Sequence, residues 1–154
     1  MEESAAVSVR FSIRALAVDD FDKGFFQLLG QLTSIDPAAI SHEDFSSFVA
    51  HLDEHHQVLV IEDAENLDQI TGSITILIER KVIHNMGKVA HIEDVVVDNN
   101  IRGTGMGKKL INKAVAISKA AGCYKTILDC SEENAGFYEA CGFEVKGKEM
   151  AMYF

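Results

Sequence analysis

The chain has 154 residues, 47% of them hydrophobic and 25% charged, which suits one globular domain with a buried core. Its net charge is −10, from 24 acidic and 14 basic residues, and this balance argues against nucleic acid as a partner. No apolar run approaches the roughly 20 residues that span a bilayer, so membrane insertion is not expected.

The N-terminus and the cysteines predict a cytoplasmic protein. The chain starts Met1-Glu2-Glu3-Ser4, which is acidic and lacks the basic and then apolar layout of a secretory signal. The 3 cysteines include no Cys-x-x-Cys pair and predict neither a disulfide framework nor a zinc site. The histidines show no ligand spacing with cysteines or paired carboxylates, so we expect no metal.

The first third of the chain predicts a strand and two helices. We expect residues 1–8 to be frayed and residues 9–154 to form a single domain that begins with a strand at 9–13. Asp19-Asp20 should cap a first helix and Ser41 a second helix over residues 41–53. The break between them falls at the only proline, and the apolar face of the first helix carries Phe21, Phe25, Leu28, Leu29 and Leu32.

The middle of the chain reads as an antiparallel meander of three strands. We expect strands at residues 57–62, 69–80 and roughly 88–97, the first two separated by an acidic turn. The strand at 69–80 is apolar on both faces, so it should be central in the sheet.

The last third predicts a long helix, a short strand and a short helix. The long helix starts at Met106 with apolar residues at helical spacing and ends at Gly122. A strand at 125–129 and a helix at 133–140 follow, and residues 143–154 should add one or two final strands. The fold class is therefore α/β, with a mixed central sheet flanked by helices.

A glycine-rich turn joins the third strand of the meander to the long helix. It reads Ile-Arg-Gly-Thr-Gly-Met-Gly-Lys-Lys over residues 101–109, directly behind Val95-Val96-Val97. Glycines let main-chain N–H groups approach an anion, and a helix N-terminus adds partial positive charge. Arg102 and Lys108 flank the turn and can contact phosphate oxygens. The turn thus predicts a site for a cofactor that carries a pyrophosphate.

Two other phosphate loops do not fit this turn. The Walker pattern requires four residues between its glycines and then Gly-Lys-Ser/Thr, whereas here Gly103 and Gly107 are closer and Lys109 follows Lys108. The dinucleotide pattern requires Gly-x-Gly-x-x-Gly near the start of a βαβ unit, but the spacing here is Gly-x-Gly-x-Gly, late in the chain. Considered alone, the turn could also be a flexible connection with a helix cap.

The pattern Arg102-x-x-Gly105-x-Gly107 resembles the coenzyme A loop of the GNAT superfamily of N-acyltransferases. Further motifs make the chain similar, from about residue 8 to about residue 150, to the glucosamine-6-phosphate N-acetyltransferase family within it. These motifs are Gly24 to Thr33, Lys81-Val82-Ile83-His84, His91-Ile92-Glu93-Asp94, Cys123-Tyr124-Lys125, Leu128-Asp129-Cys130, Asn134-Ala135-Gly136-Phe137-Tyr138 and Cys141-Gly142-Phe143.

The resemblance implies a fold, a reaction and an assembly. The fold is the GNAT acyltransferase fold, whose mixed sheet has a splayed parallel pair of strands. The reaction is transfer of acetyl from acetyl-CoA to the amine of D-glucosamine 6-phosphate by direct attack in a ternary complex, for UDP-N-acetylglucosamine synthesis and without a metal. The assembly is a homodimer, with which the apolar run Phe25-Phe26 and Leu28-Leu29 agrees.

For the cofactor, the resemblance implies a bulged strand whose exposed main chain binds the pantetheine arm, with an N–H near Val97 as oxyanion donor. Three successive valines are otherwise typical of a buried strand. Both interpretations can hold, because the side chains pack while the backbone binds. The expected cofactor residues are Val95, Val96, Val97, Arg102, Gly103, Thr104, Gly105, Met106, Gly107, Lys108, Asn134 and Tyr138.

The expected catalytic residues are Glu93, Asp94, Asp129 and Tyr138. In a regular strand only one of Glu93 and Asp94 can point into the cleft, because adjacent residues face opposite sides. By resemblance this pair holds the sugar, and Asp129 orients the amine and helps remove its proton through its carboxylate or its carbonyl. Tyr138 would donate a proton to the departing thiolate. Each residue also has a purely structural interpretation. Glu93 and Asp94 could be a solvated strand end, Asp129 could stabilise a turn or cap a helix, and Tyr138 could belong to the core packing.

The resemblance also implies groups around the sugar phosphate, some of them from the second subunit. Lys125 is the best phosphate donor, although a surface lysine explains Lys125 or Lys81 equally well. Relatives often end with a basic residue, whereas this chain has Tyr153 near that place and carries no charge there. The expected substrate residues are Thr33, Lys81, His84, Glu93, Asp94, Tyr124, Lys125 and Asp129.

Cys141 lies three residues after Tyr138, on a similar face of the short helix. Its thiol could lie near the coenzyme sulfur and form a mixed disulfide with free coenzyme A, or it could be a small buried hydrophobe.

Two other functions are compatible with parts of the sequence. A GNAT enzyme acting on a protein or polyamine amine would suit the acidic surface, but Glu93-Asp94 with Lys125 and Thr33 suits a zwitterionic sugar phosphate better. A non-catalytic acetyl-CoA sensor would not need Tyr138 and Asp129.

Overall fold

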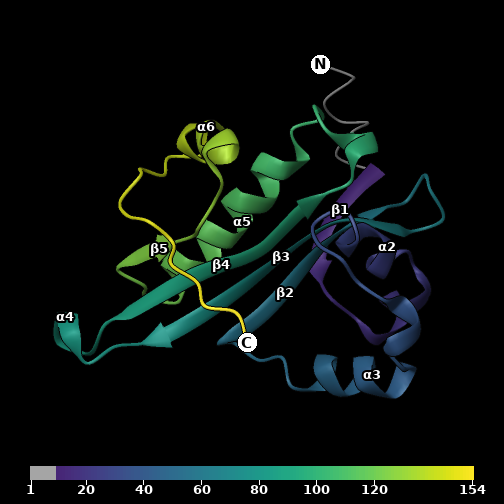
Figure 1. The fold of residues 1–154 in the computed structure, drawn as a ribbon, viewed down its shortest axis with the longest axis horizontal. Helices are drawn as coiled ribbons and strands as arrows, with labels where there is room; N and C mark the ends of the chain where they lie inside the picture. Colours follow the sequence, from purple (N-terminus) through teal and green to yellow (C-terminus); the bar gives the residue numbers. More distant parts are fainter. Residues whose placement is uncertain (1–9) are drawn as a thin grey trace.

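The computed structural model of the protein describes residues 10–154. A five-stranded sheet in the order β1-β2-β3-β4-β5 forms its centre (Figure 1). The first four strands pair antiparallel with their neighbours, and β4 pairs parallel with β5. The mixed sheet and the central place of the long apolar strand β3 are therefore confirmed. The strands are β1 (Phe11–Ala15), β2 (His56–Asp63), β3 (Gln69–Arg80), β4 (Lys88–Val97) and β5 (Lys125–Ile127).

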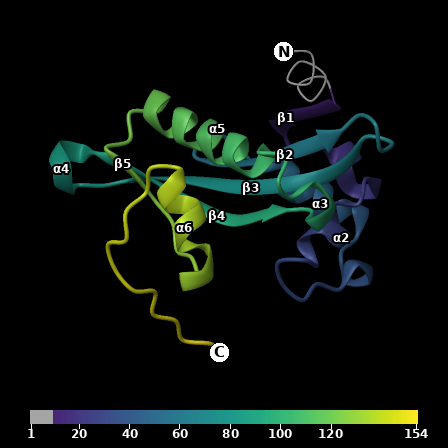
Figure 2. The same ribbon diagram turned by 90° about the horizontal axis from the view of Figure 1, so that it is seen from above.

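The helices cover both faces of the sheet. Seen edge-on in Figure 2, α5 lies along one face, while α2 and α3 lie on the other. A short α6 follows β5, and α4 is a single turn at the tip of the β3–β4 hairpin. The α-helices are α2 (Phe25–Leu29), α3 (His42–Ala50), α4 (Ile83–Met86), α5 (Met106–Ala120) and α6 (Glu132–Ala140), and the 3-10 turns are η1 (Val18–Asp22), η2 (Pro37–Ala39) and η3 (Asn99–Ile101).

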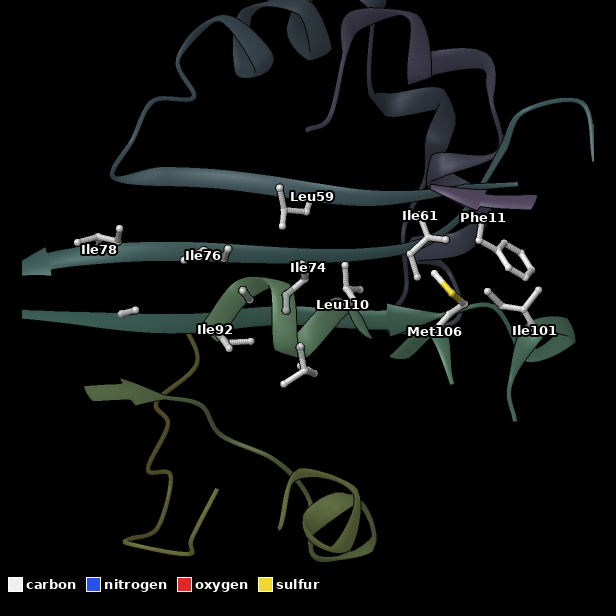
Figure 3. Packing of buried hydrophobic residues seen from close by; sticks show 13 residues of the cluster. Phe11, Leu59, Ile61, Ile74, Ile76, Ile78, Ile92, Ile101, Met106 and Leu110 are labelled. Carbon is white, nitrogen blue, oxygen red and sulfur yellow. The ribbon is translucent and has the colours of Figure 1, made fainter. Parts of the chain in front are cut away.

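The alternation of strand side chains divides the core into two clusters. On β2, Leu59 and Ile61 face α5, whereas Val58 and Val60 face the layer formed by α2 and α3. Figure 3 shows the α5 cluster, in which helix side chains at helical spacing pack on β3 and β4. Its helix members are Met106, Leu110, Ile111 and Ala114. Apolar side chains are buried on both faces of the sheet. This burial stabilises the positions of the strands, and therefore also the positions of the ends of β4 and β5.

The expected first helix is wrong in its start and its continuity. Asp20 is fully buried inside η1, where its carboxylate accepts bonds from Arg14 Nη1 (2.8 Å), Arg14 Nη2 (2.7 Å) and the Ala17 N–H (2.8 Å). Burial is the largest single effect and opposes ionisation, but the bonds from Arg14 and Ala17 and the charges of Arg14 and Lys23 together outweigh it and lower the pKa of Asp20. Gly24 then adopts a left-handed φ of 75°, which ends η1 before α2 starts. Leu32 lies beyond α2 and is exposed, so it is not on the apolar face.

The expected strands in residues 143–154 are also wrong. No helix or strand follows α6, which itself ends at a left-handed Gly142 as expected. Figure 2 shows the C-terminal segment running away from the sheet beyond α6, and its backbone pairs with none of the strands β1 to β5. The expected start of β1 at Val9 lies outside the described residues, and β1 begins at Phe11.

Candidate active site

A β-bulge interrupts β4 at Asp94. Ser73 of β3 pairs with Val96, but Thr75 pairs with Glu93, so two β4 residues stand opposite one β3 residue. Asp94 takes up the extra length with a left-handed φ of 51°. The phase of the side chains changes there, because Ile92 and Val95 pack on the same α5 cluster although they are three residues apart. The expected bulge is confirmed.

The bulge exposes both acidic residues of β4. In a regular strand one of them would face the α5 cluster, but Glu93 and Asp94 are both exposed. Beyond the bulge β4 also loses its parallel neighbour, since the last β4–β5 pair is His91 with Ile127. The main chain of residues 92–97 is therefore free on the β5 side, and the expected splay of the parallel pair is confirmed.

The glycine loop follows directly from β4 through η3. Ile101 is buried and anchors the loop, and Gly103 and Gly105 both have left-handed φ angles, of 82° and 81°. A Cβ at either glycine would meet no other atom within 4 Å, so the glycines serve the backbone conformation and leave the space above the loop open. Arg102 and Lys108 are exposed on either side of this space.

The N-terminus of α5 is unusually free to bind an anion. Its N-cap is Gly105, which has no side chain to accept from the first N–H groups, and its first turn contains no acidic residue. The positive end of the helix dipole and these unpartnered donors together favour a phosphate group. Coenzyme A carries a diphosphate, and an open loop of this kind fits it.

Aromatic packing connects this helix start with α6. A Cβ at Gly107 would lie 3.4 Å from Phe137 Cζ and 3.6 Å from Val97 Cγ2, so the glycine permits close contact of α5, α6 and the end of β4. Phe137 in turn packs edge-on against Tyr138, with the ring centres 5.1 Å apart. The loop, the free strand edge and the Tyr138 helix thus converge on one region.

Three other carboxylates act on Glu93 near the bulge. Although the side chain of Glu93 is exposed, its carboxyl is partly desolvated, and this raises its pKa most; the negative charges of Asp94, Asp129 and Glu149 raise it further, while His91 partly opposes the rise. Asp129 lies two residues beyond the end of β5, so the expected strand to residue 129 is shorter than predicted. The structure nevertheless brings Asp129 within electrostatic range of Glu93, across the splay.

Tyr138 is half-buried on α6 and packs against the α5 cluster and Phe143. Burial, followed by the nearby thiols of Cys130 and Cys141, raises the pKa of its phenol, so the hydroxyl stays protonated at neutral pH. Burial likewise raises the pKa of the Cys141 thiol, which reduces its thiolate fraction and its reactivity. Asn134 is exposed on the first turn of α6.

The expected sugar-phosphate residues fall into separate places. The His84 ring stacks on Tyr124, with centres 4.1 Å apart, and Lys125 Nζ lies 5.9 Å from the centre of the Tyr124 ring. His84 belongs to α4 at the hairpin tip, and Tyr124 and Lys125 lie at the start of β5 beside it, where a Cβ at Gly87 would lie 2.9 Å from Tyr124 Cδ1. Lys81 Nζ is paired with Glu79 at 3.0 Å, and Thr33 is exposed in the loop after α2. Within the described chain, no hydrogen bond joins Thr33 to the hairpin group.

Two residues near the site received no role from the sequence, although His91 belongs to one of the motifs that carry the resemblance. His91 stands two residues before Glu93 on the last β4–β5 pair, and its Nε2 lies 2.9 Å from Glu79 Oε1. Its period-two spacing from Glu93 was a usable signal. Glu149 belongs to the C-terminal segment, and no local pattern placed its charge beside β4.

Among residues 10–154, one group of three side chains could hold a metal ion, namely Asp53, Glu54 and His55 in the turn before β2. Asp53 already accepts the backbone N–H groups of His55 and His56, at 2.8 and 3.0 Å, so local turn bonds explain it. In the same described part of the chain, no helix is long and apolar enough to cross a membrane.

Comparison with known proteins agrees with this geometry. Residues 17–143 match the model of the acetyltransferase (GNAT) family. Glucosamine 6-phosphate N-acetyltransferase of Arabidopsis thaliana is 42% identical over 147 residues, covering 94% of this chain and 97% of that protein. Glucosamine 6-phosphate N-acetyltransferase 1 of Dictyostelium discoideum is 41% identical, covering 97% of this chain and 95% of that protein.

Solved structures give the same answer for the fold. The crystal structure of the Arabidopsis thaliana enzyme superposes with a TM-score of 0.89 at 41% identity, covering 94% of this chain and 98% of that one. A Trypanosoma brucei acetyltransferase superposes with a TM-score of 0.85 at 34% identity, covering 94% and 99%. The chain therefore belongs to the GNAT family of acetyltransferases, enzymes that take their acetyl group from acetyl-CoA.

We predict that Glu93→Gln makes the protein more stable at neutral pH. A carboxyl whose pKa is raised by folding favours the folded state below its unfolded pKa, and this contribution is lost as pH rises through the folded pKa. The variant carries no charge to repel Asp94, Asp129 and Glu149. Thermal unfolding should give a higher Tm than wild type at pH 7–8, with the difference vanishing near pH 4. A Tm difference that grows toward acid pH would contradict a raised pKa of Glu93 in the folded protein.

Proposed function

We propose that the chain transfers the acetyl group of acetyl-CoA to the amine of glucosamine 6-phosphate. The observation that carries the proposal is the bulge and splay of β4, which place a free main-chain edge and a carboxylate cluster directly before an open anion-binding loop. Relatives that bear this activity in their names match the chain over almost its whole length, which supports the choice of acceptor.

The cofactor side uses main chain more than side chains. The N–H groups of the loop from Arg102 to Lys108 bind the diphosphate, with the two basic side chains at its ends. The freed main chain of Val95, Val96 and Val97 binds the pantetheine arm, and an N–H near Val97 stabilises negative charge on the reacting carbonyl oxygen. Acetyl-CoA supplies an activated acyl group, so no protein nucleophile is required.

The acceptor side is the carboxylate cluster. Asp94 and Asp129 lie near enough to Glu93 to raise its pKa, and only His91 opposes that rise, so the combined charge of the cluster attracts the ammonium group of an amino sugar. The amine must lose a proton before or during its attack on the thioester carbon. The carboxylate or the main-chain carbonyl of Asp129 is suited to hold the amine, and a cluster carboxylate of raised pKa is suited to accept that proton.

Tyr138 completes the proton balance. As the C–N bond forms and the C–S bond breaks, the electron pair of that bond leaves on sulfur, and the thiolate requires a proton. The phenol is kept protonated by its raised pKa, and Asn134 on the same helix contacts the cofactor arm. The proton lost by Tyr138 is regained from solvent.

The acceptor phosphate requires cations that the carboxylate cluster does not provide. His84, Tyr124 and Lys125 form one group at the hairpin tip, with Lys81 nearby on the same hairpin, and Thr33 lies on a different loop. Because these places are separate in one chain, we propose that the hairpin group serves a site shared with a second subunit.

A homodimer also explains the exposed C-terminal segment. Met150, Tyr153 and Phe154 are almost completely exposed, and so is Val82 at the hairpin tip. Exposing several large apolar side chains on one unpaired extended segment to water is unfavourable. Contact with the same surface of a second copy would bury them. We propose that this segment pairs in the dimer. We further propose a cytoplasmic location and a role in UDP-N-acetylglucosamine synthesis.

A panel of amines assayed by thiol release tests the acceptor. We expect turnover with glucosamine 6-phosphate to exceed that with unphosphorylated glucosamine by at least about tenfold in kcat/KM, because a phosphate bound by cationic side chains adds charge-assisted bonds. Polyamines and lysine peptides should give little product. Strong activity on those amines and none on the sugar phosphate would replace the proposal with a protein or polyamine acetyltransferase.

Tyr138→Phe tests the proton donor. The variant keeps the ring packing and loses only the hydroxyl, so kcat should fall about 100-fold, in the range expected for loss of a general acid. Coenzyme A affinity, measured by calorimetry, should stay unchanged and serves as the control for folding. Unaltered kcat would remove Tyr138 from this role.

Size-exclusion chromatography with light scattering tests the dimer. We expect twice the chain mass of 16.9 kDa. Deleting residues 150–154 should shift the protein toward monomer, since it removes most of the exposed apolar surface of the segment. Leu67→Asn is the matched control, because Leu67 is as exposed but lies in the turn between β2 and β3. A wild-type monomer at micromolar concentration would refute the dimer.

A further inference from the structure

Gln31 bridges two segments that are far apart in sequence. It follows α2, and its carboxamide reaches the connection between β4 and the glycine loop, 67 residues away. Its Nε2 donates to Asp98 Oδ2 at 3.0 Å, and its Oε1 accepts the Asn99 N–H at 3.1 Å. Because both ends of the amide are engaged, the side chain is fixed in one orientation.

Hydrogen bonds continue from this contact into the glycine loop. Asp98 accepts the Asn100 N–H on Oδ1 at 2.7 Å and the Ile101 N–H on its main-chain oxygen at 3.1 Å. The Ile101 carbonyl then accepts the Thr104 hydroxyl at 2.6 Å. Thr104 lies between the two left-handed glycines. An unbroken path therefore runs from Gln31 to the centre of the loop.

The other end of the bridge is the loop after α2. The Gln31 N–H donates to Leu28 at 3.0 Å and the Thr33 N–H to Leu29 at 3.1 Å, so this part of the loop is wound tightly onto the end of the helix. Thr33 is one of the residues proposed to contact the acetyl acceptor, glucosamine 6-phosphate. The Gln31 carboxamide thus joins the loop on the acceptor side to the loop on the cofactor side.

The glycine loop has few other restraints. Its outer side is open, since a Cβ at Gly103 or Gly105 would meet nothing within 4 Å. Its conformation is therefore set from its two ends, where Ile101 on one side and α5 on the other are packed in the core. A contact that fixes the entry to η3 acts at one of these two ends.

We propose that Gln31 is a positioning residue, which holds the entry to the glycine loop through Asp98 and so sets the affinity for coenzyme A. This inference rests on the proposed cofactor role of the loop. Gln31 itself touches neither the loop residues nor the carboxylate cluster, and it acts through the Asp98–Ile101 connection.

The effect of Gln31 on coenzyme A binding can be separated from a general effect on the stability of the fold. Gln31 and Asn99 are exposed, so water can replace the bonds that a shorter side chain would lose, and no buried polar group would be left without a partner. The free energy of unfolding should therefore change little, while a loop that must be ordered before it binds an anion loses its restraint.

Calorimetric titration of coenzyme A into the Gln31→Ala variant tests the proposal. We expect the dissociation constant to rise about 3- to 10-fold, the effect of one or two exposed hydrogen bonds, and the KM for acetyl-CoA to rise in parallel. The kcat should stay within about twofold and the Tm within about 2 °C of wild type. Gln31→Glu should bind more weakly than Gln31→Ala, because it loses the donor and places a second carboxylate beside Asp98.

Gln27→Ala is the matched control. Gln27 is exposed on α2, one turn before Gln31, and lines the same surface pocket as Gln31 and Asp98. Unlike Gln31, its carboxamide bonds to no other described residue. This variant should bind coenzyme A like wild type. In an Asp98→Ala background, Gln31→Ala should raise the dissociation constant by a smaller factor than in wild type, because one of the two bonds of the bridge is already absent and only the bond to the Asn99 N–H remains to be lost.

The outcomes separate this inference from the proposed function. If the wild-type protein does not bind coenzyme A, the proposed function fails. If wild type binds and Gln31→Ala binds within twofold of it, or Gln27→Ala weakens binding equally, the positioning role of Gln31 is wrong. A fall in Tm of more than about 4 °C with Gln31→Ala would also overturn it, in favour of a general structural role.

Discussion

The bulge at Asp94 is the constraint on which the site depends. A strand inside a sheet uses its main-chain groups for pairing, and its side chains alternate between two packed faces. A substrate site on such a strand therefore needs an interruption. The extra residue in β4 ends the alternation, turns two adjacent acidic side chains outward and separates the strand from β5 beyond His91. The backbone that is freed is the part that leads into the glycine loop.

The same feature concentrates unfavourable charge. Partial desolvation raises the pKa of Glu93, and the negative charges of Asp94 and Asp129 raise it further. A left-handed aspartate is itself a conformation that costs some backbone strain, although Asp and Asn tolerate it better than most residues. The charge repulsion and the backbone strain both destabilise the folded protein without ligand. An ammonium group placed among the carboxylates would reduce the repulsion. Strain and repulsion at this point of the sheet thus agree with the acceptor site that we propose there.

Local patterns predicted much of the fold, because periodicity and turn chemistry decide those elements. The bounds of β3 and β4, the start of α5 at Met106 and the Ser41 cap of α3 agree with expectation. The glycine loop was also predictable, since positive φ angles at Gly103 and Gly105 are a local requirement.

The failures share a different cause. The first helix breaks because Asp20 is held by Arg14, a contact between separate elements that overrides a capping signal. The strands predicted in residues 143–154 do not form, because a strand requires a partner and the described part of this chain offers none. Glu149 and Gln31 act through side chains whose neighbours lie dozens of residues away, so no spacing in the sequence points to them.

The acidic composition of the chain is compatible with two anionic substrates because binding depends on short-range donors. At physiological ionic strength the field of distant charges is screened over about 8 Å, whereas a phosphate in contact with main-chain N–H groups is within hydrogen-bond range. The first turn of α5 contains no carboxylate, and the acidic cluster lies on the strand, where we propose that the amine binds. Opposite local charges therefore lie at the two ends of one short stretch, from Glu93 to Lys108, and this polarity is suited to orient the proposed cofactor and acceptor relative to each other despite a net charge of −10.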